Sequence, residues 1–193
     1  MEDCGAMPSR TDPVRALFVA AAVVAAGPAL VGCAGTDKGA ESGAPAGLVG
    51  NPAPDFHVTA VTGPKGAIAL NDLHGQVVLL DFWGTFCEPC KKSFPKLEDL
   101  NRKYASSGLR VIGISEDEDE DKDKIPAFAQ TYGAKFSLAW DEDRSVAKRY
   151  KPETMPSSFI IDKEGIVRFA HVGFHDGEEV EVESEIRGLL GVK

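Results

Sequence analysis

Cysteine is scarce in this sequence, which argues against one class of protein at once. Only four cysteines, Cys4, Cys33, Cys87 and Cys90, occur in 193 residues. Small domains held together by disulfides carry several pairs at scattered positions, and a four-cysteine zinc site needs a second close pair. Basic residues are also in the minority, with 21 Lys and Arg against 30 Asp and Glu. The net charge of -9 argues against nucleic acid as a partner.

A long apolar run is missing as well. The uncharged stretch from Ala16 to Leu30 is too short for a membrane span, and it follows Arg10 and Arg15. Basic residues before a short apolar stretch predict an export signal. The stretch ends in Leu30-Val31-Gly32-Cys33, which resembles the bacterial lipobox, where cleavage precedes a cysteine that carries lipid. The alternative is an ordinary signal anchor in which Cys33 is incidental.

These features divide the chain into three predicted parts. Residues 1–32 form a lipoprotein signal peptide, and residues 33–50, rich in Gly, Ala, Ser and Pro, form a flexible tether. Residues 51–193 have the usual length of one folded domain. Lipid on Cys33 would hold that domain to a bacterial membrane surface, on the periplasmic side or the outer cell surface, without a spanning helix.

The segment Cys87-Glu88-Pro89-Cys90 is the most informative part of the domain. It follows an apolar run, Val77 to Trp83, that predicts a buried central strand, and it precedes a helical pattern that begins near Lys91. At a helix start, unpaired N–H groups and the helix dipole favour the thiolate of the first cysteine, which is the nucleophile of disulfide exchange. Half of a zinc site and two ordinary core cysteines remain as alternatives.

The rest of the domain alternates between strand and helix patterns. A hairpin is expected before residue 71, a strand at Leu109 to Ile114, and helices at 125–132 and 145–150. A second hairpin at 158–171 and an amphipathic helix close the chain. Glu116 to Lys124, with seven acidic and two basic residues, predicts a solvated loop. This order predicts an α/β fold with a mixed central sheet.

Two motifs carry a resemblance to a known family. The stretch from Asp81 to Lys92, followed by Pro95, resembles the thioredoxin superfamily, and Thr154 to Phe159 matches its cis-proline loop in position and spacing. The opening hairpin and the additional helix at 125–132 are similar to the TlpA/ResA branch of membrane-tethered thiol-disulfide oxidoreductases. The resemblance covers residues 50–193. It implies a thioredoxin-like fold, with helices flanking the mixed sheet, an N-terminal hairpin and one inserted helix.

The resemblance also implies roles for individual residues. Cys87 and Cys90 would form the redox disulfide, Asp81 would relay a proton to and from Cys90, and Pro156 would follow a cis bond. Contacts with the substrate would come from Trp83, Phe86, Glu88, Pro89 and Met155. Two residues depart from the family: Ser93 stands where close relatives have a glutamate, and Phe86 replaces a more usual tryptophan. No cofactor and no metal are expected.

The expected activity is that of a reductant, with a potential more negative than about -200 mV. Glu88 and Asp81 oppose a thiolate at Cys87, whereas Lys91 and Lys92 favour it but are expected to be screened by solvent. The family implies protein disulfides as substrates, in cytochrome c maturation or copper-site assembly. It also implies an integral-membrane thiol donor of the CcdA or DsbD kind. We expect a monomer.

Two other functions remain open at the level of sequence. A peroxiredoxin shares the fold and an opening like Pro54-Asp55-Phe56, but its reactive cysteine normally follows a threonine by three residues, where this chain has Gly84. A copper-binding chaperone would use His171 or His175 as a third ligand beside the two cysteines. Such chaperones usually separate their cysteines by three residues, whereas two separate them here.

Overall fold

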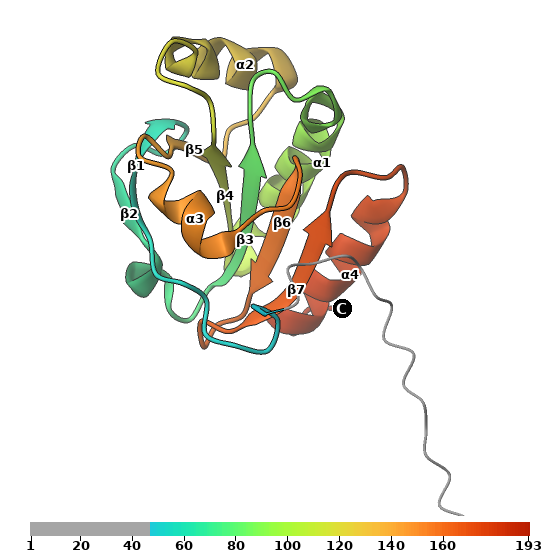
Figure 1. Cartoon of the computed structure of the whole chain (residues 1–193). Helices are drawn as coiled ribbons and strands as arrows, with labels where there is room; N and C mark the ends of the chain where they lie inside the picture. The colour runs from blue at the N-terminus through green and yellow to red at the C-terminus, as the bar shows by residue number, and fades with distance from the viewer. Residues whose placement is uncertain (1–46) are drawn as a thin grey trace, which may run out of the picture. The chain divides into compact units, whose positions relative to one another are not determined.

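The central strand β3 (Val77–Trp83) organises the fold, because all seven of its residues are buried. We describe residues 47–193 from a computed structural model (Figure 1). The other strands are β1 (His57–Thr62), β2 (Ala67–Ala69), β4 (Leu109–Ser115), β5 (Ser137–Trp140), β6 (Ser157–Ile161) and β7 (Val167–Val172). The helices are α1 (Glu88–Tyr104), α2 (Ile125–Tyr132), α3 (Ser145–Tyr150) and α4 (Glu178–Leu190).

The seven strands form one mixed sheet in the order β2-β1-β5-β4-β3-β6-β7. β3 pairs in parallel with β4, and β4 with β5, while β6 and β7 form an antiparallel hairpin next to β3. β1 and β2 form the antiparallel hairpin that opens the domain. The sequence-based prediction of a thioredoxin-like α/β fold with a mixed sheet is therefore confirmed, as are the opening hairpin and the inserted helix α2.

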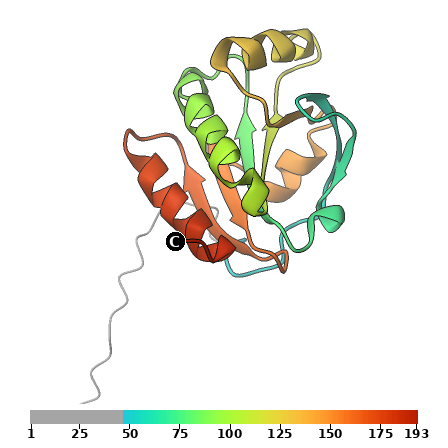
Figure 2. The same cartoon turned by 180° about the vertical axis from the view of Figure 1, so that it is seen from behind.

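The two faces of the sheet are covered by different helices, and the alternation of side chains along β3 supplies both cores. Val77, Leu79 and Trp83 belong to the core that packs under α1, α2 and α4. Val78, Leu80 and Phe82 belong to the core that packs under α3. Figure 1 shows α3 in front of the sheet, and Figure 2, from behind, shows α1 and α4 across the other face.

Helix α1 begins at Glu88, three residues earlier than the sequence predicts, because Cys87 caps it. Cys87 has an extended backbone, with φ of -79° and ψ of 107°, and its sulfur accepts a hydrogen bond from the backbone N–H of Cys90. Pro89 in the first turn fits a helix start, since the missing N–H would have no partner there. The helix continues through Pro95. This cap places both cysteines at the start of α1, next to the carboxyl end of β3.

Two features differ from the sequence-based expectation. Strand β5 has only four residues and was not predicted, since its Ser-Leu-Ala-Trp sequence shows no alternation. The acidic run is solvated only from Glu118 onward, because Glu116 and Asp117 at its start are buried. The expectation of a fully solvated loop is therefore wrong for those two residues.

The predicted signal peptide, Cys33 and most of the predicted tether lie outside the described residues. Residues 47–50 form a turn, in which the backbone N–H of Gly50 donates to the carbonyl oxygen of Val167 at 2.8 Å. Among residues 47–193, no helix is both long enough and apolar enough to cross a membrane.

Candidate functional site

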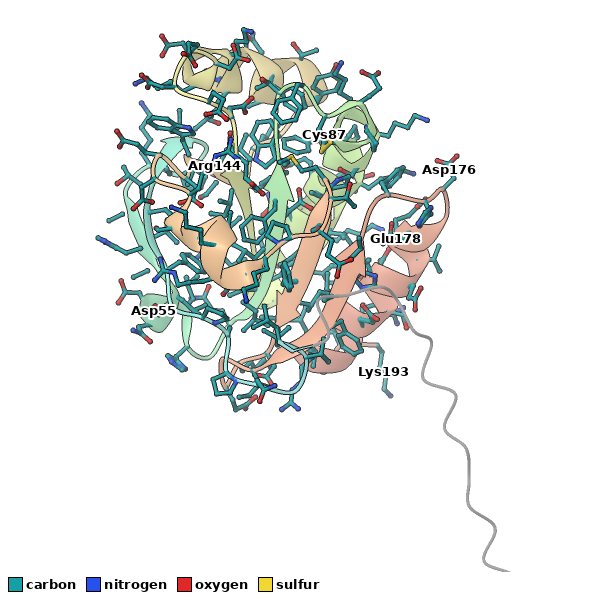
Figure 3. The ribbon with its side chains drawn as sticks, in the orientation of Figure 1. Asp55, Cys87, Arg144, Asp176, Glu178 and Lys193 are labelled. Atoms are coloured by element: carbon teal, nitrogen blue, oxygen red, sulfur yellow. A yellow bond between two sulfur atoms is a disulfide. The ribbon has the colours of Figure 1, made fainter. Side chains whose placement is uncertain are left out.

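Cys87 and Cys90 are joined by a disulfide at the start of α1, with their Cα atoms 5.3 Å apart. The two cysteines differ in exposure. Cys90 is fully buried, whereas Cys87 retains 6% of its surface and borders a groove. Figure 3 shows Cys87 at the end of the domain where α1 begins. A sulfur at the rim of the domain and a partner sulfur one turn inside it suit attack by the first and resolution by the second.

The groove beside Cys87 has a volume of about 380 Å³. Phe86 and Pro89 line it from the side of α1, and Met155 lines it from the loop before β6. The Met155–Pro156 peptide bond is cis, and the Pro156 carbonyl accepts a hydrogen bond from the N–H of Gly173 at 2.8 Å. Phe86 is 64% exposed, which is unusual for a large apolar side chain. The groove is therefore apolar at its rim and open to an extended peptide.

Asp81 is fully buried on the face of β3 that α1 covers. Its Oδ1 accepts a hydrogen bond of 2.6 Å from the Ser158 hydroxyl, and its Oδ2 has no partner within the described part of the chain. Burial raises the pKa of Asp81 to about 7; the Ser158 hydrogen bond lowers this pKa, and the charge of Glu178 raises it. A carboxyl of this kind exchanges protons near neutral pH, which suits general acid–base chemistry.

The remaining predicted substrate contacts occupy three different environments. Trp83 is fully buried, with ring-centroid distances of 4.6 Å to Phe94 and 4.7 Å to Phe128, so it forms the wall behind the cysteines. Pro89 is exposed at the groove. The side chain of Glu88 is 78% exposed and pairs with Lys91 at 2.5 Å. In this oxidised form Phe86, Pro89 and Met155 border the groove, and Trp83 does not reach the surface.

Ser93 lies one turn after Cys90 and is buried at 6% exposure. Its hydroxyl donates to the Cys90 carbonyl oxygen at 3.1 Å, and it lines the same cavity as Asp81. The position where close relatives of the family have an acid is therefore neutral here. Asp81 is the buried carboxyl of this cavity, and it approaches from the sheet instead of from the helix.

Asp117 anchors the loop that carries the cysteine motif, a role that no sequence pattern predicted. It accepts hydrogen bonds from the Thr85 N–H at 2.9 Å, from the Thr85 hydroxyl at 2.5 Å and from the Ser115 hydroxyl at 2.6 Å. The side chain links the end of β4 to the turn between β3 and α1. A run of acidic residues looks the same in sequence whether its side chains are solvated or hydrogen-bonded. The role of Asp117 is therefore visible in the structure and not in the sequence.

Glu116 is the second buried acid that the sequence missed. It lines the groove next to Cys87, and its Oε1 has no hydrogen-bond partner among the described residues. Burial raises the pKa of Glu116, the Arg144 guanidinium lowers it, and Asp141 raises it. The groove therefore has a buried acidic residue in its lining, in addition to Phe86, Pro89 and Met155.

The geometry can be compared with the two alternative functions, a copper-binding chaperone and a peroxiredoxin. Both ring nitrogens of His171 contact carboxylates of α4, so its imidazole is engaged away from the cysteines. Within residues 47–193, no group of three His, Cys, Asp or Glu side chains is placed to hold a metal ion. A Cβ on Gly84 would lie 2.7 Å from the ring of Phe86, so a threonine there would displace that ring. The His171 contacts argue against a third copper ligand at this residue.

Comparisons with known proteins agree on one family. A model described as the AhpC/TSA family matches residues 49–170. The thiol-disulfide oxidoreductase ResA of Bacillus thuringiensis (strain Al Hakam) is 38% identical over 133 residues, which are 69% of this chain and 75% of that protein. ResA of Bacillus subtilis (strain 168) is 36% identical over 118 residues, covering 61% and 64%. A crystal structure described as thiol:disulfide interchange protein DsbE from Chlorobium tepidum is 34% identical, with a TM-score of 0.66 and coverage of 72% and 96%.

The anchoring role of Asp117 leads to a prediction for Asp117→Asn. The amide replaces one acceptor oxygen with a donor that faces the N–H or hydroxyl of Thr85, which costs about 1–3 kcal/mol locally. Hydrogen exchange at the Thr85 amide should accelerate roughly tenfold or more. The matched control is Asp119→Asn, whose carboxylate is exposed and pairs with Lys122. Equal exchange rates in the two variants would show that Asp117 does not hold the loop.

The burial of Asp81 predicts how stability depends on pH. The pKa of Asp81 is about 7 in the folded protein against an ordinary value of 3.8, so the folded state binds the proton more tightly than the unfolded chain does. Its contribution to the free energy of unfolding is therefore largest below about pH 4 and is lost as the pH rises to about 7. Asp81→Asn removes this loss.

Urea unfolding of the oxidised full chain measures the effect. Between about pH 5.5 and pH 8, the stability of Asp81→Asn relative to the wild type should rise by roughly 2 kcal/mol. Asp176→Asn, which changes an exposed carboxyl, should keep the wild-type dependence on pH. Parallel curves for Asp81→Asn and the wild type would contradict the raised pKa.

Proposed function

Because the chain belongs to the AhpC/TSA family and to the ResA-like thiol-disulfide oxidoreductases, we propose that it reduces disulfides of other proteins with the dithiol of Cys87 and Cys90. The observation that carries this proposal is the disulfide at the start of α1, with Cys87 at the groove and Cys90 fully buried behind it. A substrate sulfur reaches Cys87 first. Cys90 is buried, so an external disulfide does not reach it, and its sulfur reacts with the sulfur of Cys87.

The reaction begins with the reduced form of the protein. The Cys87 thiolate attacks one sulfur of a substrate disulfide; a Cys87–substrate bond forms, and the other substrate sulfur leaves as a thiolate that takes up a proton. The free N–H groups at the start of α1 and the helix dipole stabilise the attacking thiolate. Phe86, Pro89 and Met155 line the groove in which the substrate segment would lie.

Resolution of this mixed disulfide needs a proton acceptor. The Cys90 thiol gives its proton to the Asp81 carboxylate and attacks the sulfur of Cys87, so the second substrate thiol is released and the Cys87–Cys90 disulfide forms. Two electrons have then passed to the substrate. Asp81 suits this step because its pKa of about 7 lets it accept and return a proton near neutral pH. A donor dithiol restores the reduced form by the reverse exchange.

The direction of electron flow follows from the charges around the dithiol. Glu88 in the first turn of α1 and the buried Asp81 disfavour an additional negative charge at Cys87. Lys91, which would favour that charge, is already paired with Glu88. A thiolate with this little net stabilisation makes the disulfide form persist and the dithiol a reductant.

The setting of the reaction is also part of the proposal. A lipid on Cys33 would tether the domain to the extracytoplasmic face of a bacterial membrane, and an integral-membrane thiol protein of the CcdA or DsbD kind would supply electrons. The support is the lipobox-like sequence that ends in Cys33 and the likeness to the ResA proteins. Substrates of the cytochrome c maturation or copper-site assembly type fit the same family.

Trapping of the mixed disulfide tests the function with purified full chains. Reduced Cys90→Ala should form a stable one-to-one mixed disulfide with insulin chains through Cys87, because the neighbouring thiol that resolves this bond in the wild type is absent. The wild type, supplied with dithiothreitol, should reduce insulin disulfides and accumulate no adduct. Mass spectrometry and the turbidity of the released chains measure the two outcomes.

Cys87→Ala is the matched control for this experiment. It keeps the buried thiol of Cys90 and loses the one at the groove, so it should neither form the adduct nor turn over. Turnover by Cys87→Ala at the wild-type rate would overturn the assignment of the nucleophile. Rapid consumption of hydrogen peroxide by the wild type, without reduction of insulin, would favour a peroxidase instead.

A further inference from the structure

A row of polar side chains crosses the sheet behind the dithiol. Asp81 of β3 is the register partner of Ser158 of β6, and Ser158 is the register partner of His171 of β7. The Ser158 hydroxyl bridges toward β3 by donating to Asp81. Because register partners on neighbouring strands point to the same face, all three side chains lie on the face covered by α1 and α4. Asp81 and His171 are buried and Ser158 is partly buried, and packed apolar side chains of the same face lie around them.

Two glutamates of helix α4 contact His171, the last residue of this row. His171 Nδ1 lies 3.4 Å from Glu178 Oε1, and Nε2 lies 2.7 Å from Glu185 Oε2. Burial lowers the pKa of His171, but the contacts with Glu178 and Glu185 outweigh it and raise that pKa to about 9. The imidazolium holds Glu178 in its charged form, and the pKa of Glu178 is lowered despite its burial. Glu178 is thus a fixed negative charge at the start of α4.

Glu178 and Asp81 line one small cavity between α1, α4 and the sheet. Its volume is about 40 Å³, which is enough for an ordered water molecule. Ser93 and Pro156 line the same cavity, so it adjoins both the helix of the cysteines and the cis-proline loop. Figure 3 shows Glu178 at the beginning of α4, next to the open end of the β6–β7 hairpin. Asp81 and Glu178 therefore border the same narrow space, whose surface is mostly apolar.

We propose that Glu178, held by His171, is a positioning residue that keeps the proton on Asp81 at near-neutral pH across their shared cavity. A negative charge near a buried carboxyl disfavours its ionisation, and the low polarity of the surroundings strengthens the effect. The proposal rests on the function proposed above for its link to catalysis. In that reaction, Glu178 sets the pH at which Asp81 accepts the proton of Cys90.

The other charged side chains near Asp81 are each paired with a residue of opposite charge. From α1, Lys96 reaches the cavity, but it pairs with Glu179 at 3.0 Å. From the loop before α4, the backbone N–H of His175 donates to Glu178 Oε2 at 3.1 Å and fixes its orientation. Glu185 is bound to the far side of His171. Glu178 is the acid of α4 whose charge raises the pKa of Asp81.

Carboxyl ¹³C NMR of Asp81 in the oxidised full chain tests the proposal. Glu178→Gln should lower the titration midpoint of Asp81 by roughly half a pH unit to one pH unit. Glu181→Gln is the matched control: it removes an acid from the same turn of α4 whose side chain is exposed, so the midpoint should not move. Glu178→Asp, which keeps the charge, should retain most of the wild-type midpoint.

An unchanged Asp81 midpoint in Glu178→Gln would overturn the proposal, as would equal shifts in Glu178→Gln and Glu181→Gln. If the glutamine variant does not fold, Glu178→Ser removes the same charge with a residue that suits a helix start, and the same shift is expected.

Insulin reduction measured against pH separates this inference from the proposed function. If the Asp81 midpoint shifts and the rate profile does not, the inference holds, and the role of Asp81 in turnover fails. If the rate profile shifts while the Asp81 midpoint stays in place, the function holds and the inference fails.

Discussion

The hydrogen bond by which Cys87 caps α1 sets the geometry of the whole site. The Cys87 sulfur accepts the N–H of Cys90 at 3.2 Å, so the helix starts at the cysteine motif itself. This start turns Cys90 into the core and leaves Cys87 at the rim of the groove. Asp117 holds the preceding turn through Thr85, and the cis Met155–Pro156 loop closes the groove from the other side. The rest of the sheet supports these two loops.

The site carries an electrostatic cost that a purely structural core would not. Asp81 is buried beside the cavity that Glu178 also lines, in a position where an apolar side chain would fit the strand pattern, and one of its oxygens has no partner among residues 47–193. Burial destabilises its ionised form, which is the property that the proposed proton transfer from Cys90 requires. The neighbouring buried charges are compensated, because His171 of β7 pairs with Glu178 and Glu185 of α4.

Sequence patterns predicted the elements whose signal is local. The apolar run of β3, the helix α2 and the two hairpins were found because their periodicity or turn residues lie within a few positions. Asp117 and the His171–Glu178 pair were not found, because their partners come from other elements and their own neighbours in sequence are charged or polar in any case. The pairing of distant strands decides which acid is buried, and local composition does not carry that information.

The equilibrium of the Cys87–Cys90 pair with a defined thiol–disulfide buffer measures the reduction potential of the dithiol. In the proposed function, the Cys87 thiolate gains little stability from its surroundings, so the dithiol gives up its electrons to other proteins. This direction of electron flow predicts a reduction potential more negative than about -200 mV, on the scale where thioredoxin lies near about -270 mV. A potential near about -120 mV, typical of a strong oxidant, would contradict it.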